Sequence, residues 1–343
     1  MNLSDFDYEL PDALVAQEPV SPRDASRLLV VPRDGGPLLE GTFSEIGQFL
    51  RPGDLLVLND TRVIPARLVG VKESGGRCEL LLVEPLGGEL GARWRVLGQA
   101  SKPLRRGARL SFGGLEARVE SAEGEGFFTV SFDRSGAELE AALDREGRVP
   151  LPSYIRREPR PADRERYQTV VARVPGSAAA PTAGLHFTGD LLERLARAGV
   201  TCTTVTLHVG PGTFLPVRTE DLAQHRMHEE RYEVSPAAAR AFADCRARGG
   251  RVVAVGTTAV RTLESAWTAA GLRAGPGRTS LFVRPPYQFR AVDALVTNLH
   301  LPRSTLLMLT CAFGGRETVL AAYREAVSRG YRFFSYGDAM LLS

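Results

Sequence analysis

The chain has 343 residues, which is enough to bury large cores and to form about two domains. Hydrophobic residues make up 43% of the chain and charged residues 24%, values typical of a globular protein and unlike those of disordered or membrane-spanning chains. The formal net charge of +3 is too small to demand a nucleic-acid partner. Lys72 and Lys102 are the only lysines. Arginine suits phosphate binding, but codon usage in a GC-rich genome explains its excess equally well.

The cysteines and the N-terminus predict a cytoplasmic protein with reduced thiols. The four cysteines are far apart and show no C-x-x-C spacing, so neither a disulfide framework nor a zinc knuckle is expected. Residues 1–7 are acidic and lack the apolar core of a signal peptide. No apolar run is long enough to span a bilayer.

The first 62 residues contain two predicted strands, at 28–31 and 55–58. The second is a continuous apolar run that leads directly into Asn59, Asp60, Thr61 and Arg62. Ligands bind at the carboxyl ends of strands in open α/β sheets, so these polar residues are site candidates. An ordinary turn at the end of a strand is the alternative.

Residues 63–132 differ in sequence pattern from the segment before them. Short β-rich runs alternate with glycine-rich turns, a pattern that favours a small antiparallel barrel or sandwich. A helix is expected at 137–145, and the prolines at 149–152 end the unit. We therefore predict a small antiparallel β-barrel domain at 63–150, inserted into an α/β domain formed by 1–62 and 151–343.

A polar connection rich in arginine and proline follows at 153–166, flanked by Tyr154 and Tyr167. Its prolines argue against a long helix. The segment suits either phosphate binding with base stacking on the tyrosines, or a solvated linker. Its arginines are Arg156, Arg157, Arg160, Arg164 and Arg166.

From residue 188 onward the chain alternates between strands and helices. Thr188 is a suitable N-cap and Gly199 a suitable stop for the helix between them. Ser235 and Pro236 begin another helix in the same way. This alternation predicts a parallel or mixed sheet flanked by helices. Strands are expected at 201–207, 251–255 and 294–297, and helices at 191–198, 235–248, from 258 through 267, after 305 and at 317–329.

One local pattern, Leu-His followed by an apolar residue, occurs at His186, His208 and His300. Each of these histidines lies near a predicted strand end or helix start, where it could move a proton, hold a carboxylate or fix a base. A satisfied core histidine is the alternative for each one. Nearby Gly and Thr residues at 256–258 and 210–213 suit a carboxylate or phosphate, because they precede predicted helices. The chain contains no Walker loop, no dinucleotide fingerprint and no nucleophile elbow.

His225 and His228 raise the alternative of a metal-dependent hydrolase. Histidines three residues apart can share one helix face, and carboxylates are adjacent. The H-E-x-x-H order is missing, however, so no metal is predicted. A non-catalytic RNA-binding protein that uses the barrel and the arginine-rich linker is a further alternative.

Together these segments resemble the S-adenosylmethionine:tRNA ribosyltransferase-isomerase family of queuosine biosynthesis. The resemblance covers essentially the whole chain, with one small departure at Leu299, where the family usually carries Phe. The segments that carry it are 59–67, 167–169, 180–188, 207–214, 225–229, 256–258, 261–265, 297–298, 300–302 and 336–340.

The resemblance implies that the ribosyl moiety of S-adenosylmethionine is transferred to 7-aminomethyl-7-deazaguanine at the tRNA wobble position and isomerised. It implies the product epoxyqueuosine, with adenine and methionine released. It also implies an α/β domain that carries a β-barrel domain. S-adenosylmethionine is then a substrate, tRNA is the partner, and neither a metal nor a membrane is involved. A monomer is expected.

This chemistry needs a base, an acid and an anion site. Proton transfer is assigned to His186, His208 and His300, with Asp60 or Glu264 as charge partner, and the motifs do not distinguish the acid from the base. The residues expected to bind S-adenosylmethionine are Thr61, Arg62, Thr182, Gly184, Gly210, Gly212, Thr213, Thr257, Thr258, Arg261, Glu264 and Asn298. Those expected to bind tRNA are Tyr154, Arg156, Arg157, Arg160 and Tyr167.

Overall fold

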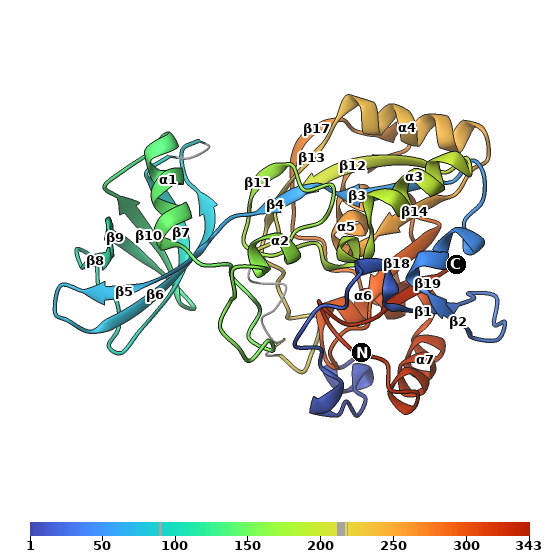
Figure 1. Ribbon diagram of the computed structural model, residues 1–343, viewed down its shortest axis with the longest axis horizontal. Coiled ribbons are helices and arrows are strands. Elements are labelled where there is room, and N and C mark those ends of the chain that lie inside the picture. The colour runs from blue at the N-terminus through green and yellow to red at the C-terminus, as the bar shows by residue number, and fades with distance from the viewer. Residues whose placement is uncertain (89–90, 211–216, 218) are drawn as a thin grey trace.

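The computed structural model describes residues 1–88, 91–210, 217 and 219–343. It contains a nine-stranded mixed sheet flanked by helices, and a closed six-stranded antiparallel barrel that forms a separate lobe beside the sheet (Figure 1). The predicted fold class is therefore confirmed. The proposed extent of the inserted domain, 63–150, stays a prediction.

Four neighbouring strands at the centre of the sheet, β12, β3, β14 and β18, run parallel to one another. Their carboxyl ends therefore meet at one edge, which is where ligands bind in open α/β sheets. Beyond β18 the chain direction reverses, because β19 is antiparallel to β18 and parallel to β1. In spatial order the strands are β17 (Gly275–Thr279), β13 (Glu230–Val234), β12 (Thr201–Leu207), β3 (Leu55–Asn59), β14 (Val252–Val255), β18 (Ala294–Asn298), β19 (Ala339–Leu342), β1 (Arg27–Val31) and β2 (Leu39–Thr42).

β3, β14 and β18 are largely apolar and buried along their whole length because helices cover both faces of the sheet, whereas β12 is rich in threonine. In β1, Leu28 and Val30 pack into one core, whereas Leu29 and Val31 pack into the other. Each such side chain stabilises the fold by about 1.5–3 kcal/mol when fully buried. One core includes α4 (Pro236–Ala247), α5 (Gly256–Ala266), α6 (Thr305–Gly314) and α7 (Arg316–Ser328), and the other includes η4 (Phe43–Phe49) and α3 (Gly189–Arg197).

The barrel has its own core, with Trp94 and Phe112 almost fully buried, and α1 (Gly136–Glu146) packs into that core through Leu139 and Leu143. Alternating burial along β6 is the period-two pattern of a strand with one face inward. The barrel order is β10 (Phe127–Phe132), β7 (Arg93–Ala100), β6 (Arg77–Pro85), β5 (Arg67–Lys72), β8 (Arg109–Phe112) and β9 (Leu115–Gly124).

Four strands of the large sheet, β2, β13, β17 and β19, were not predicted from the sequence. β13 carries three charged residues and β17 contains two glycines and a proline, so neither looks like a strand. β19 is a short apolar segment near the end of the chain.

The remaining elements are η1 (Leu3–Phe6), η2 (Asp12–Leu14), η3 (Arg23–Ala25), β4 (Thr61–Val63), α2 (Asp163–Arg166), β11 (Val174–Ser177), η5 (Thr182–His186), β15 (Trp267–Thr268) and β16 (Gly271–Leu272). Within the described residues, no helix has the length and apolar character needed to cross a membrane.

Candidate active site

A cavity of about 420 Å³ opens beside the end of β18. A smaller hollow of about 30 Å³ adjoins it, and the two share four residues, among them Thr182, Asn298 and His300. The smaller hollow adds Thr258 from the start of α5, and the larger one adds Phe334 from the segment before β19. We call these two adjoining hollows together, defined by these five residues, the strand-end cleft. Its volume lies in the range of small-molecule sites, about 300–1,000 Å³.

Asn298, the last residue of β18, presents an unpaired acceptor beside this cleft. Its Nδ2 lies 3.1 Å from the carbonyl oxygen of Phe334 and 3.0 Å from Nε2 of His186. A carbonyl oxygen only accepts, so the atom that faces it must be the amide nitrogen, which fixes the orientation of the amide. The amide oxygen Oδ1 is then buried and has no partner among the described residues.

This orientation also determines the tautomer of His186. Because Nε2 accepts from Asn298, Nδ1 carries the proton and donates to Ser26 Oγ at 2.7 Å. Burial, assisted by the charge of Arg332, lowers the pKa of His186 to about 3, so the imidazole is neutral at neutral pH. Both ring nitrogens are engaged within the protein. His186 is thus arranged to orient Asn298.

His300 is different because one of its ring nitrogens is free. Nε2 lies 2.7 Å from Thr297 Oγ1, while Nδ1 has no partner in the described part of the chain. The hydroxyls of Tyr8 and Tyr323 hold its backbone, at 2.5 Å from the carbonyl oxygen and 3.0 Å from the nitrogen. Burial lowers the pKa of His300 to about 3. A neutral ring whose Nε2–H donates to Thr297 leaves the Nδ1 lone pair able to accept a proton.

The start of α5 forms another wall of the cleft. Gly256 has φ +87°, a region that favours glycine, and its neighbour Val255 supplies no side-chain cap. The first backbone N–H groups of this 11-residue helix therefore have no side-chain acceptor among the described residues, and they carry the positive end of its dipole. The hydroxyl of Thr258 is also buried without a partner among the described residues. Such a group of donors suits a carboxylate.

Two non-glycine residues with left-handed backbone line the cavity, Arg303 with φ +58° and Phe334 with φ +74°. Conformations of this kind cost about 1–3 kcal/mol and cluster at functional sites. The Phe334 ring packs on Tyr154 at 4.1 Å between centroids, so the cavity has an aromatic wall. Neither Phe334 nor Ser26 was predicted as a site residue. The only sequence signal near Phe334 was the family segment 336–340, which begins two residues later.

His208 and Asp60 do not join the strand-end cleft. His208 Nδ1 lies 2.9 Å from Thr61 Oγ1, and burial lowers its pKa to about 4. Asp60 is buried and accepts from Thr206 at 2.6 Å, Thr204 at 2.9 Å and Arg173 at 2.8 Å. The carboxylate therefore ties β3 to β12, and its hydrogen-bonding capacity is used within the fold.

Other predicted ligand residues are also engaged elsewhere. Arg261 forms a buried ion pair with Glu230, and Glu264 accepts the backbone N–H groups of Arg290 and Ala291. Arg62 is exposed beside a different hollow, near Glu140.

Of the glycines predicted to bind the substrate, Gly184 and Gly210 have roles within the fold, and Gly212 lies outside the described residues. At Gly184 a Cβ would lie 2.8 Å from Thr169, so glycine is needed there for packing. Gly210 donates its N–H to Glu230 at 2.9 Å. Gly212 and Thr213 lie outside the described residues.

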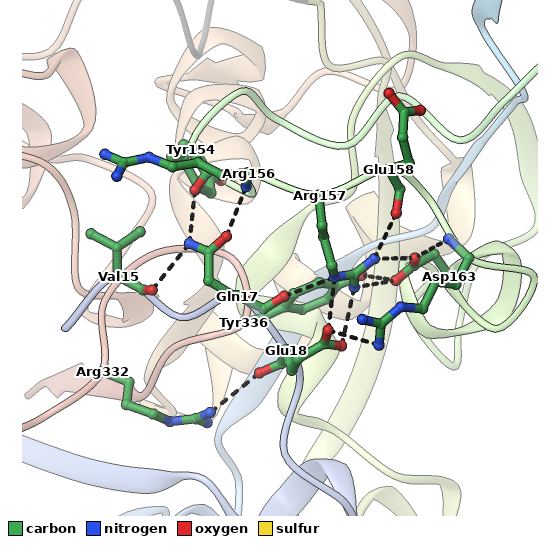
Figure 2. A network of polar contacts seen from close by, with 11 residues as sticks. Val15, Gln17, Glu18, Tyr154, Arg156, Arg157, Glu158, Asp163, Arg332 and Tyr336 are labelled. Carbon is green, nitrogen blue, oxygen red and sulfur yellow. Dashed lines mark hydrogen bonds and ion pairs between the residues drawn. The ribbon is translucent and has the colours of Figure 1, made fainter. Parts of the chain in front are cut away.

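The predicted tRNA-binding arginines are paired with carboxylates. Arg157 donates to both oxygens of Asp163, at 2.6 and 2.9 Å, and lies 2.9 Å from Glu18, as Figure 2 shows. Arg160 also pairs with Glu18, and the exposed Arg156 pairs with Asp12.

The two predicted stacking tyrosines are also held within the fold. The Tyr154 hydroxyl lies 2.5 Å from Ser335 Oγ. Tyr167 is fully buried against Tyr336, so its ring offers no face to a nucleobase. The predicted stacking on Tyr167 does not fit this burial.

His225 and His228 each contact an aromatic ring, Phe282 and Phe127 respectively, with 5.0 and 5.2 Å between centroids. In the described part of the chain no group of three His, Cys, Asp or Glu residues is arranged to hold a metal ion.

Comparison with known proteins identifies the family. Residues 3–342 match the model of the queuosine biosynthesis protein family. The chain is 70% identical over 343 residues to an S-adenosylmethionine:tRNA ribosyltransferase-isomerase of Anaeromyxobacter sp. (strain Fw109-5), covering 100% of this chain and 99% of the relative. It is 54% identical to the protein of the same name from Geobacter sulfurreducens, with complete coverage of both chains. The crystal structure of the Thermotoga maritima S-adenosylmethionine tRNA ribosyltransferase matches with 40% identity and a TM-score of 0.58, over 99% of this chain and 100% of that one. The chain therefore belongs to the queuosine biosynthesis protein family.

Proposed function

We propose that this chain transfers the ribosyl moiety of S-adenosylmethionine to 7-aminomethyl-7-deazaguanine at the tRNA wobble position and isomerises it. The product is epoxyqueuosine-tRNA, and adenine and methionine are released. The names of the relatives support the reaction class. The observation that carries the proposal is the surplus of hydrogen-bonding groups in the strand-end cleft, where Asn298 Oδ1 and Thr258 Oγ1 have no partner among the described residues.

The chemical features of S-adenosylmethionine fit the walls of the cleft. The uncapped start of α5 suits the methionine carboxylate, because its N–H groups and helix dipole favour an anion. Asn298 Oδ1 suits an amino group of the substrate, since it can only accept. The aromatic wall formed by Tyr154 and Phe334 suits a purine ring or the cationic sulfonium.

His300 is the proposed proton acceptor for the position next to the sulfonium. Its free Nδ1 and its place in both hollows support this role. Burial keeps the imidazole unprotonated at neutral pH, although the lowered pKa also makes it a weaker base. His186 is proposed to position Asn298. His208 and Asp60 are proposed to organise the strand ends and not to touch the substrate.

The test is to incubate the protein with S-adenosylmethionine and tRNA that carries 7-aminomethyl-7-deazaguanine, and to measure free adenine and the mass of the modified nucleoside. We expect one adenine and one methionine for each epoxyqueuosine formed. Adenine release that does not depend on the modified tRNA, or a methylated tRNA product, would contradict the proposal. Tight binding of S-adenosylmethionine without any turnover would also count against it.

A further inference from the structure

Arg23 and Arg166 line a second, shallow hollow of about 20 Å³ beside the strand-end cleft. His186, Ser335 and Tyr336 contribute to its wall. Ser335 also lines the 420 Å³ cavity, and His186 is bonded to Asn298, which lines the cleft. The hollow and the candidate active site therefore share Ser335 and are linked through His186.

Both arginines lack a carboxylate partner in the part of the chain that the structure describes. Arg23 donates to the backbone carbonyls of Glu165 at 2.9 Å and Gln168 at 2.7 Å, and Arg166 donates to the carbonyl of Val20. A guanidinium has donors on all three of its nitrogens, so most of those on Arg166 stay unused. Arg157, only a few residues away along the chain, instead has Asp163 and Glu18 as partners.

The two positive charges are close enough to disfavour each other. Burial, followed by the charge of Arg166, lowers the pKa of Arg23, and the nearby Glu165 only partly opposes this effect. A third arginine, Arg332, acts on the adjacent His186 with the same sign. Arg332 itself has Asp338 at 3.9 Å, so the surplus positive charge is centred on Arg23 and Arg166.

We propose that Arg23 and Arg166 bind a phosphodiester group of the RNA substrate, next to the nucleotide whose base enters the strand-end cleft. This inference rests on the proposed function and adds a specific contact to it. A space of about 10–15 Å³ holds one water-sized group, so the hollow accepts one phosphate oxygen while the rest of the group stays outside. That geometry suits a diester in a continuous chain. Arginine also binds phosphate in a planar, bidentate manner.

Arg166→Gln is the sharper variant, because Arg23 also holds three backbone carbonyls near the end of α2. The measurement is the affinity for substrate tRNA over a range of salt concentrations, with S-adenosylmethionine affinity measured in parallel by calorimetry. Losing one phosphate contact should weaken tRNA binding about tenfold at low salt and reduce the slope of log K against log salt by about 0.7. Affinity for S-adenosylmethionine should not change, and the melting temperature should fall only slightly, because one hydrogen bond to the carbonyl of Val20 is lost.

Arg324→Gln is the matched control, because Arg324 is exposed on α7 and lies away from the hollow. An unchanged salt slope in Arg166→Gln, or an equal loss in Arg324→Gln, would overturn the proposal. Stabilisation of the wild type by inorganic phosphate alone, lost in Arg166→Gln, would assign the hollow to a free anion and also overturn it. Adenine release by the wild type tests the proposed function separately, so the two can fail independently.

Discussion

The strand-end cleft and the end of β3 both place polar residues at the carboxyl edge of the same sheet, but they use them differently. In the cleft, Asn298 Oδ1 and Thr258 Oγ1 are buried without partners among the described residues. At the end of β3, both oxygens of the Asp60 carboxylate accept hydrogen bonds, from Thr204, Thr206 and Arg173. Position at a strand end is therefore insufficient to identify a ligand site. Unused hydrogen-bonding capacity is the more discriminating feature.

This difference between the cleft and the end of β3 should affect the stability of the fold. A buried polar atom without a partner costs about 1–3 kcal/mol, whereas a satisfied one contributes to stability. We therefore expect substitutions in the cleft to affect binding and catalysis more than stability. Substitutions at the Asp60 cluster should affect stability more than chemistry.

The largest effect is expected for His300→Gln. If Nδ1 of His300 accepts a proton in the reaction, the single-turnover rate of adenine release should fall about 100- to 10,000-fold. Calorimetry should show little change in the affinity for S-adenosylmethionine. His208→Gln is the matched control, since His208 lies outside the cleft, and its rate should stay close to that of the wild type. Similar rates in both variants would remove the distinction between the two regions.

Asp60→Ala should lower the stability of the fold more than the rate of the reaction. It leaves the buried hydroxyl of Thr206 and its neighbour Thr204 without their acceptor, so the free energy of unfolding should fall by about 2–4 kcal/mol. The change is measured by urea unfolding, with Asp144→Ala at an exposed position as control. A variant that keeps full stability but loses the reaction would instead make Asp60 a catalytic residue.

Acid should destabilise the fold through two buried histidines, His186 and His300. Burial lowers the pKa of His186 and of His300 to about 3, below the ordinary value of about 6.5 that the unfolded chain has. Below pH 6.5 the unfolded chain binds protons that the folded one does not. The stability is therefore complete above about pH 6.5 and is lost as the pH falls toward 3, by about 1.4 kcal/mol per pH unit for each histidine.

Urea unfolding at about pH 7.5 and about pH 5.5 measures this loss, and His186→Gln should make it smaller. An equal loss in wild type and variant would mean that His186 does not titrate as its burial implies.

The smallest effect is expected for Thr258→Val, which removes a buried hydroxyl while keeping the shape of the side chain. The melting temperature should stay constant or rise, because the hydroxyl has no partner in the described fold. Affinity for S-adenosylmethionine should fall about tenfold if the ligand uses this group. Thr310→Val is the control, since its hydroxyl donates to Leu306 within α6, at 2.9 Å. If Thr258→Val lowers the melting temperature but leaves the affinity for S-adenosylmethionine unchanged, the hydroxyl has a structural role and does not bind the ligand.

Local sequence was sufficient for much of the α/β domain. Thr188 and Ser235 cap α3 and α4 with their side chains, as their positions predict, because capping depends only on residues within one turn. Apolar runs correctly predicted β3, β14 and β18, since strands covered on both faces need no alternation. The threonine-rich β12 was predicted from the alternation of strands and helices. The strands β13 and β17 escaped prediction because their pairing in the sheet outweighs their weak propensities.

The sequence by itself determined the fold class, the family segments and the fact that polar residues follow the central strands. Only the tertiary structure decided which of those residues meet. β12 and β18 are three strand spacings apart, about 14 Å, so His208 and His300 occupy different surroundings despite their matching motifs. The reversal of direction at β19 brings the residues before β1 and β19 to the end of β18, which places Ser26 and Phe334 around His186 and Asn298. Strand order and direction depend on contacts between residues far apart in the chain, and no local pattern encodes them.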